Sequence, residues 1–264
     1  MFRTGLLLLL VLAAFLGAQN VYDRNDGEAH GDAPYLIEPA WRALFNGKDY
    51  TGWHGQDPKQ AFGWITARAI AYERLLGPTR LEAVGGPGDR MLNGPGRTVN
   101  LVTDEKFGDS ELYLEFMLSK GSNSGVYLHG LYEVQVFDSF GTPEYMVKTS
   151  DCGAIYHRWI NEQGVGGSRP IVNASRAPGQ WQSFHIWFQG PRFDDAGKKT
   201  QNAKFVRVLH NGVLIQQNVE VDGGTRAHMP IPEAATNPIM LQGDHGPVAF
   251  RNIYIRPLRP IVNR

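Results

Sequence analysis

Apolar and polar residues alternate with a period of two along residues 122–138. Four aliphatic side chains point to one side of an extended chain: Val126, Leu128, Val134 and Val136. Aromatic and polar side chains point to the other: Tyr127, His129, Glu133 and Gln135. Gly130-Leu131 divides the segment in two. The pattern predicts two antiparallel strands joined by a tight turn, with one face buried.

Similar short segments recur along the chain and predict about eleven strands. They are 63–66, 98–102, 110–118, 125–129, 132–137, 153–156, 182–189, 203–210, 213–221, 239–242 and 248–256. Asn211-Gly212 is a strong hairpin signal between two of them. Only one short helix is expected, around 39–44. So many strands in one domain predict an all-β fold, an antiparallel jelly-roll β-sandwich of two sheets.

Composition fits one exported domain. The 264 residues are 42% apolar and carry 26 basic and 26 acidic side chains. With no basic run, nucleic acid and anionic membranes are poor partners. Cys152 is the single cysteine. No internal disulfide can form, and we expect this thiol to be buried rather than nucleophilic.

The first residues have the layout of a secretory signal peptide. Arg3 precedes an apolar run over 6–16, and small residues end at Ala18. We expect a signal peptide over 1–18, a polar linker over 19–40 and the β-sandwich domain over 41–262. The protein would then be periplasmic or extracellular, with no integral membrane span after cleavage. An uncleaved N-terminal anchor is the alternative.

The polar face of the first hairpin suits a sugar, because rings can stack on it and amides and carboxylates can bond its hydroxyls. Two more strands show the same character, one with His185 and Trp187 and one with Glu111, Tyr113 and Glu115. We expect all of these strands to share one sheet whose outer face is a binding cleft. An ordinary hydrated face is the alternative.

An ordered series of motifs resembles the 3-keto-disaccharide hydrolase domain family. The motifs are FNGKD at 45–49, TGW at 51–53, SELYLEF at 110–116, SNSGVY at 122–127, YEVQV at 132–136, CGAIY at 152–156, NAS at 173–175, PGQWQ at 178–182, HNGV at 210–213, LQ at 241–242, DHG at 244–246, FRNI at 250–253 and RPL at 256–258. Gly243 interrupts the LQDHG expected there, and the loop 159–168 is individual. The resemblance implies a concanavalin A-like sandwich, export from bacterial cells and action on 3-keto-glycosides.

A 3-keto-glycoside sets clear chemical demands. Its ketone acidifies the C2 hydrogen, so a base can form an enolate that expels the group at C1, and water then completes a net hydrolysis. We expect His129 and Glu133, on one face, to be base and acid in an unassigned order. Arg251 would polarise the ketone oxygen. The residues expected to bind substrate are Tyr127, Gln135, Glu115, Trp187, His185, Asn173, Asp244 and His245.

Other readings of the same residues stay open. A divalent cation would stabilise an enolate, but no HxH or HExxH spacing names its ligands, so no cofactor is assigned. A non-catalytic, lectin-like carbohydrate-binding sandwich would bind sugar without cleaving it. A retaining glycosidase would need two close carboxylates, with Glu111, Glu115 and Glu133 as candidates.

Overall fold

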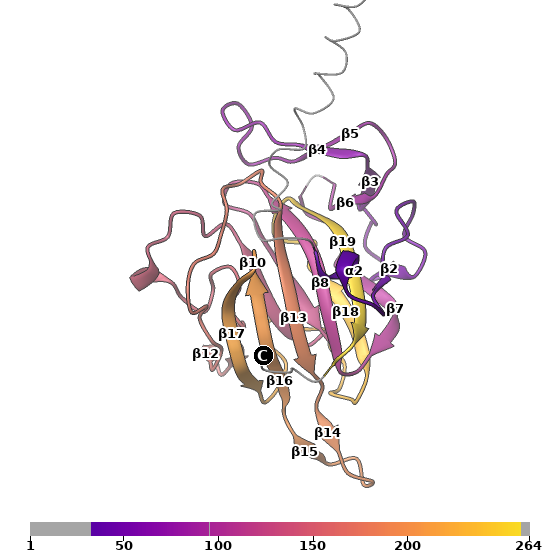
Figure 1. Ribbon diagram of the computed structural model, residues 1–264, viewed down its shortest axis with the longest axis vertical. Coiled ribbons are helices and arrows are strands. Elements are labelled where there is room, and N and C mark those ends of the chain that lie inside the picture. The colour runs from indigo at the N-terminus through magenta and orange to yellow at the C-terminus, as the bar shows by residue number, and fades with distance from the viewer. Residues whose placement is uncertain (1–32, 95, 260–264) are drawn as a thin grey trace, which may run out of the picture.

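The computed structural model describes residues 33–94 and 96–259 and shows two antiparallel sheets packed face to face (Figure 1). The larger sheet runs in the order β17 (Val213–Val221), β16 (Ala203–His210), β13 (Gln182–Gln189), β8 (Ser110–Leu118), β19 (Val248–Pro257), β6 (Arg90–Leu92) and β3 (Ile65–Ala67), with β1 (Arg42–Ala43) also paired to β19. The smaller sheet runs in the order β10 (Tyr132–Phe137), β9 (Asn123–Leu128), β18 (Asn237–Leu241), β7 (Leu101–Phe107) and β2 (Trp53–Gly55). The predicted all-β sandwich is confirmed.

Small elements decorate the sandwich. Three two-stranded ribbons pair β4 (Ala69–Ala71) with β5 (Glu82–Val84), β11 (Arg158–Ile160) with β12 (Gln163–Val165), and β14 (Arg192–Phe193) with β15 (Lys199–Gln201). The helical turns are α2 (Pro34–Ile37) and η1 (Glu144–Met146). The short helix expected around 39–44 is wrong, because β1 occupies that segment.

The core lies between the two sheets and follows the alternation of the sequence. Val126, Leu128, Val134 and Val136 are fully buried on the inner face of the smaller sheet. Alternate residues of β8 and β13 face them from the larger sheet: Leu112, Leu114, Phe116, Phe184, Ile186 and Phe188. Burying this apolar area is the main stabilising contribution to the fold. The same alternation sends the polar side chains of each strand to the outer faces.

The expectation of one polar sheet face is wrong. β8 and β13 pair with each other in the larger sheet, whereas β9 and β10 pair in the smaller one. Their polar faces therefore lie on opposite sides of the sandwich. The reason is that alternation reports which side of its own strand a residue occupies and not which sheet the strand joins.

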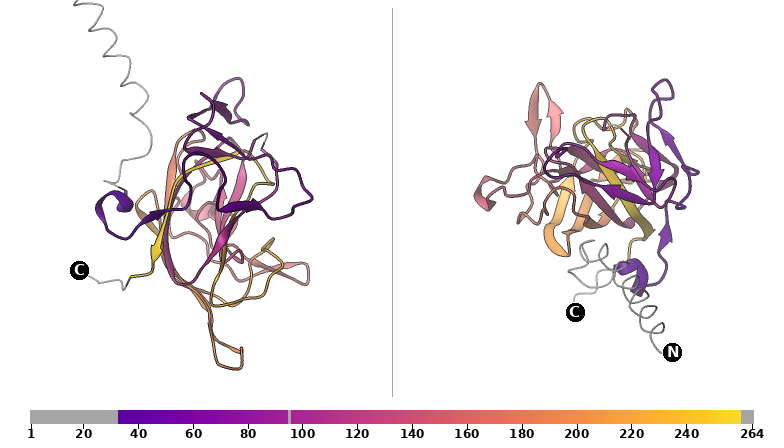
Figure 2. Two further views of the ribbon diagram at one scale, coloured as in Figure 1. Left: turned by 90° about the vertical axis from the view of Figure 1, so that its right-hand side faces the viewer. Right: turned by 90° about the horizontal axis from the view of Figure 1, so that it is seen from above.

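The chain before β1 covers part of the outer face of the larger sheet (Figure 2). The Tyr35 ring stacks on Tyr254 with ring centroids 3.9 Å apart. Trp41 meets the His185 ring edge-on at 5.5 Å. The described end of the predicted linker thus packs against the domain, while the predicted signal peptide lies outside the described residues. Within the described ranges, no helix has the length and apolar character needed to cross a membrane.

Candidate active site

A cavity of about 240 Å³ opens on the outer face of the smaller sheet. Its floor comes from β9 and β10, and loops at 156, 226–227 and 242–245 form its walls. The lining residues are Asn123, Tyr127, Glu133, Gln135, Tyr156, Arg226, Ala227, Gln242 and His245. Four predicted site residues therefore meet in one cavity: Tyr127, Glu133, Gln135 and His245.

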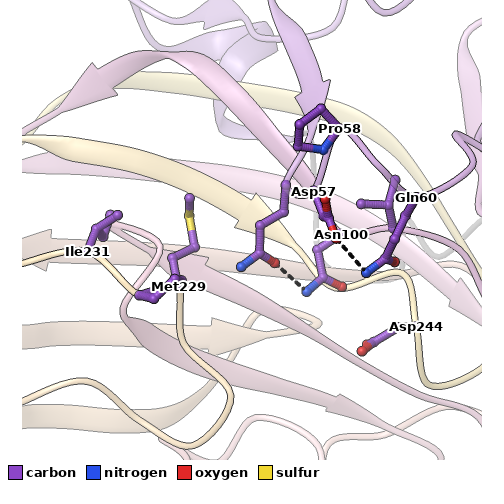
Figure 3. Close-up of a pocket in the computed structure, with 10 residues that line it drawn as sticks. Asp57, Pro58, Gln60, Asn100, Met229, Ile231 and Asp244 are labelled. Atoms are coloured by element: carbon purple, nitrogen blue, oxygen red, sulfur yellow. Dashed lines mark hydrogen bonds between the residues drawn. The ribbon is translucent and has the colours of Figure 1, made fainter.

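A larger cavity of about 500 Å³ lies over the β2 and β7 side of the same sheet (Figure 3). It is lined by Gln56, Asp57, Pro58, Gln60, Val99, Asn100, Met229, Pro230, Ile231 and Asp244. Asp244 was predicted to bind substrate, and it borders this cavity while its neighbour His245 borders the smaller one. The two cavities therefore adjoin at the loop that follows β18.

Glu133 places a carboxyl group on the floor of the smaller cavity. It lies opposite Tyr127 in the β9–β10 register and is only 3% exposed. Burial raises the pKa of Glu133 to about 8, the negative charge of Asp244 adds to the rise, and a hydrogen bond with Tyr127 opposes it. At neutral pH this carboxyl is mainly protonated, so it can donate a proton.

The Tyr127 hydroxyl connects Glu133 to the wall of the cavity. It donates a hydrogen bond to the Arg226 carbonyl oxygen at 3.1 Å. Burial raises the pKa of Tyr127 well above its usual value, so the phenol stays neutral. A protonated Glu133 can donate to the Tyr127 oxygen while Tyr127 donates to Arg226. This arrangement satisfies the buried carboxyl without an ion pair.

Asp244 and His245 form a carboxylate–imidazole pair at the rim. His245 Nδ1 lies 2.5 Å from Asp244 Oδ1, and each side chain is 48% exposed. The hydrogen bond to Asp244 raises the pKa of His245, against a smaller opposing effect of burial. With Nδ1 held by the carboxylate, Nε2 is the ring nitrogen left for proton transfer.

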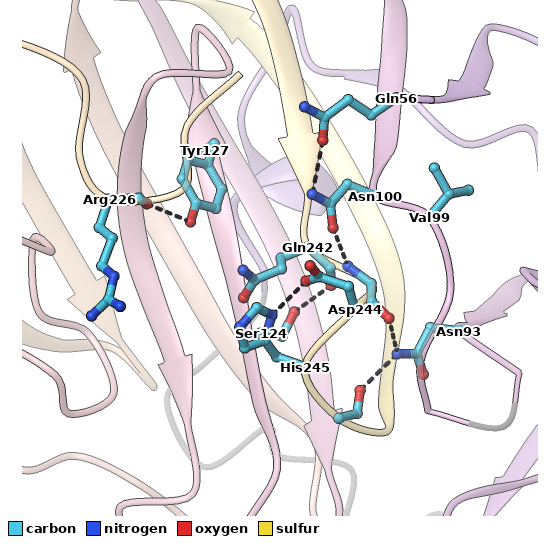
Figure 4. A network of polar contacts seen from close by, with 12 residues as sticks. Gln56, Asn93, Val99, Asn100, Ser124, Tyr127, Arg226, Gln242, Asp244 and His245 are labelled. Atoms are coloured by element: carbon cyan, nitrogen blue, oxygen red, sulfur yellow. Dashed lines mark hydrogen bonds and ion pairs between the residues drawn. The ribbon is translucent and has the colours of Figure 1, made fainter. Parts of the chain in front are cut away.

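Gly243, the extra residue in this loop, is held from both sides by Asn100 and Asn93, which Figure 4 labels. Its N–H donates to Asn100 Oδ1 at 2.9 Å, and its carbonyl oxygen accepts from Asn93 Nδ2 at 3.0 Å. A Cβ at this position would lie 2.7 Å from the Val99 carbonyl oxygen, so no larger residue fits. The added glycine thereby sets where Asp244 and His245 stand.

Five lining residues were not predicted as site residues: Asn123, Tyr156, Arg226, Ala227 and Gln242. Tyr156 reaches the cavity because its N–H donates to the Glu133 carbonyl oxygen at 3.1 Å beside β10. Gln242 does so because its N–H donates to the Gly125 carbonyl oxygen at 2.9 Å. Both belong to family motifs, which was the available signal. Arg226 lies in a loop without a motif, and its guanidinium packs 4.0 Å from the Trp159 ring centroid.

The shared face predicted for His129 and Glu133 is wrong. His129 has a φ of 57°, and this left-handed backbone takes its side chain off the outer face followed by Tyr127. Its ring lies 5.0 Å from the Phe188 ring, at the end of the core, and is 1% exposed. Burial lowers the pKa of His129 to about 4, so the imidazole is neutral. The structure does not bring it to Glu133.

Four further predicted site residues lie on the outer face of the larger sheet: Glu115, His185, Trp187 and Arg251. Arg251 Nε donates to Glu115 Oε2 at 2.5 Å, and its guanidinium also packs on Trp181. His185 stacks on Trp187 at 3.6 Å. The sandwich separates all four from the cavity. It also separates Glu111 and Glu115 from Glu133. Neither Glu111 nor Glu115 can therefore pair with Glu133 as the two close carboxylates of a retaining glycosidase.

Asn173 and Cys152 lie outside the cavity and contribute to the fold. The Asn173 amide donates to the carbonyl oxygens of Ser139 and Thr142 at 2.8 and 2.9 Å, which ties two loops together outside the cavity. Cys152 is buried as expected, and burial raises the pKa of its thiol to about 12. Across 33–94 and 96–259, no cluster of three or more His, Cys, Asp or Glu side chains is arranged to hold a metal ion.

Comparison with known proteins identifies relatives of this fold. A crystal structure described as a "putative glycosyl hydrolase" from Parabacteroides distasonis ATCC 8503 is 28% identical, with a TM-score of 0.60 over 83% of this chain and 84% of that chain. Another structure with that description and source is 17% identical, with a TM-score of 0.55 over 87% and 99%, and supports the fold alone. Comparison with curated proteins found no match. Residues 40–256 match the 3-keto-alpha-glucoside-1,2-lyase-like domain, so the chain belongs to that family, as its motifs predicted.

Proposed function

We propose that this protein is a glycoside-cleaving enzyme that eliminates the C1 substituent of 3-keto-glycosides at the smaller cavity. One observation carries the proposal: a buried, protonated carboxyl and a carboxylate-held imidazole line the same cavity. Membership of the family supports the substrate class, and the similar structure described as a glycosyl hydrolase supports action on glycosides.

The reaction needs a base at C2 and an acid at the leaving oxygen. His245 Nε2 takes the C2 proton, and the electron pair of that C–H bond forms an enolate with the C3 ketone. The enolate then expels the C1 oxygen, which takes the proton of Glu133 and leaves as an alcohol. A water molecule adds to the resulting C1=C2 bond, so the net change is hydrolysis.

Other lining residues supply recognition. The Arg226 guanidinium is the cation of this cavity that can stabilise the enolate oxygen, a role first expected of Arg251. The amides of Gln135 and Gln242 are placed to bond sugar hydroxyls. Tyr127 holds Glu133 and the Arg226 loop in position.

The test uses 4-nitrophenyl 3-keto-α-glucoside and its unoxidised parent in D₂O. We expect nitrophenol only from the oxidised substrate, with solvent deuterium at C2 of the sugar product. Glu133→Gln should lower kcat by about 100-fold or more, while Glu105→Gln, an exposed carboxyl on β7, should not. Equal release from the parent, without deuterium at C2, would contradict the elimination. Sugar binding without release would favour a lectin-like function.

We also propose that the chain is exported, on the leader-like sequence of residues 1–18. Expression with a C-terminal tag in a Gram-negative host, followed by fractionation, tests this. Recovery outside the cytoplasm with an N-terminus near Gln19 is expected, and recovery in the cytoplasm with residues 1–18 intact would contradict it.

A further inference from the structure

We infer that Trp159 is a positioning residue of the proposed reaction, because its indole ring holds the Arg226 guanidinium at the smaller cavity. The inference rests on the proposed function, which gives Arg226 an enolate oxygen to stabilise. Trp159 is not among the residues that line the cavity, so it acts through Arg226. It belongs to the ribbon of β11 and β12, within the segment 159–168 that carries no family motif.

The Arg226 side chain needs a partner outside its own loop. Its carbonyl oxygen accepts from the Tyr127 hydroxyl at 3.1 Å, which fixes the backbone, and the side chain leads away from that bond (Figure 4). Among the described residues that line the cavity, Glu133 has the only carboxyl group, and it is mainly protonated. The lining therefore offers no carboxylate to the guanidinium. An exposed arginine that nothing holds would lose its place among many rotamers.

Trp159 is the side chain that holds the guanidinium. The Cζ atom of Arg226 lies 4.0 Å from the centroid of the Trp159 ring. A cation within about 6 Å of a ring centroid is attracted by the negative face of the ring. At an exposed site such a contact favours the bound arrangement about two- to fivefold, and it gains strength when a ligand excludes water.

The ribbon that carries Trp159 is itself tied to the Arg226 loop. Arg158 forms an ion pair at 2.9 Å with Asp222, at the start of the loop that carries Arg226. The Arg226 N–H donates to the His157 carbonyl oxygen at 2.9 Å. The two residues directly before Trp159 thus both contact this loop. These contacts keep the indole ring within reach of the guanidinium.

The ribbon also has a defined geometry of its own. Asn161 and Glu162 both have positive φ, 48° and 62°, as a two-residue type I′ turn requires. Trp159 pairs with Gly164 across the ribbon. Because neighbouring residues of a strand point to opposite sides, Ile160 points away from the side that Trp159 occupies. Ile160 is 38% exposed and Trp159 is 48% exposed, so Ile160 provides a matched control on the same strand.

The guanidinium held in this way acts on the proposed base. The hydrogen bond to Asp244 raises the pKa of His245, and the positive charges of Arg97 and Arg226 oppose that rise. If the guanidinium leaves the indole ring and the cavity, its opposition is lost and the pKa of His245 rises. The pKa of His245 therefore reports where the guanidinium stands, whether or not the protein turns over a substrate.

The kinetic experiment measures nitrophenol release from 4-nitrophenyl 3-keto-α-glucoside. Arg226→Met should lower kcat about 100-fold, because it removes the cation at the enolate oxygen. Trp159→Ala should lower kcat about 3- to 10-fold and change KM less than about twofold, because the enolate charge develops only in the transition state. Trp159→Phe keeps an aromatic face and should retain about half of the wild-type kcat or more. Ile160→Ala should keep the wild-type kcat.

A double variant separates positioning from a general loss of structure. In the Arg226→Met background, Trp159→Ala should lower kcat by less than about twofold, because the group through which it acts is absent. Equal losses from Trp159→Ala in the two backgrounds would overturn the inference. A loss in Ile160→Ala as large as that in Trp159→Ala would overturn it as well.

A titration tests the inference without turnover. NMR of the His245 ring protons against pH gives the pKa of this imidazole in each variant. Arg226→Met and Trp159→Ala should both raise the pKa, while Trp159→Phe and Ile160→Ala should leave it at the wild-type value. If the wild-type protein releases no nitrophenol, the proposed function fails, and the titration still tests the contact. An unchanged pKa of His245 in Trp159→Ala would show that Trp159 does not position Arg226.

Discussion

The Glu133 carboxyl occupies the space that a side chain at Gly125 would need. A Cβ built on Gly125 would lie 2.2 Å from Oε1 of Glu133 and 2.9 Å from the Tyr127 ring. Gly125 pairs with Gln135, the neighbour of Glu133 along the same face. The absent side chain at 125 is thus what lets the carboxyl lie flat on the floor of the cavity.

Gly125→Ala is expected to displace the Glu133 carboxyl and to lower kcat toward that of Glu133→Gln. Overpacking should cost about 1–3 kcal/mol of stability, so activity is compared on folded protein verified by thermal unfolding. Gly77→Ala is the control, because its Cβ would meet no atom closer than 3.9 Å. Wild-type kcat in Gly125→Ala would show that the observed position of the carboxyl is not required.

The stability of the protein should depend on pH through Glu133. Burial holds the pKa of Glu133 near 8 against a usual 4.5. The contribution of this carboxyl to the free energy of unfolding is therefore complete below pH 4.5 and is lost as the pH rises toward 8. Glu133→Gln cannot ionise, and it should gain stability relative to the wild type, on the order of a few kcal/mol, between pH 5 and pH 8. Urea unfolding across that range measures the difference. Parallel curves for the two proteins would contradict a raised pKa.

Asp244→Asn should move the pH dependence of kcat/KM to lower pH. The Asp244 carboxylate raises the pKa values of both His245 and Glu133. Its loss should therefore lower the pKa of the proposed base and the pKa of the proposed acid together. Asp104→Asn is the matched control, because Asp104 pairs with His54 at 2.6 Å on an exposed surface outside both cavities. If Asp104→Asn moves the pH profile equally, or if neither variant moves it, the Asp244–His245 pair has no part in the mechanism.

Arg251→Ala should weaken the fold and leave the chemistry intact. Its guanidinium and the Glu115 carboxylate are about one-tenth exposed, and removing one partner leaves a buried charge at a cost of about 3–5 kcal/mol. The double variant Arg251→Met, Glu115→Gln should recover part of that loss. Thermal unfolding and kcat are measured together. A lower kcat in a stably folded double variant would show that Arg251 takes part in the reaction, as the sequence first suggested.

Some features of the site followed from local pattern. Period-two alternation placed Tyr127, Glu133 and Gln135 on one face, and the motif at 244–246 pointed to the Asp244–His245 pair. The same rule failed at His129, because a residue with positive φ in a hairpin turn no longer follows the alternation of its strand. It also could not separate the Glu133 face from the His185 and Trp187 face, which lie on different sheets.

By itself, the sequence determined the long strands of both sheets, their buried sides and the family, because these depend on residues close together in the chain or on ordered motifs. The strand predicted over 153–156 is wrong, and the short strands β4, β5, β11, β12, β14 and β15 were not predicted. The tertiary structure decided which strands are neighbours and so which polar groups meet. Pairing of β9 with both β10 and β18 sets Glu133 beside the loop that carries His245, and the turn before Met229 brings in Arg226. Such contacts join segments some hundred residues apart, and they arise because each sheet must bury its apolar face against the other.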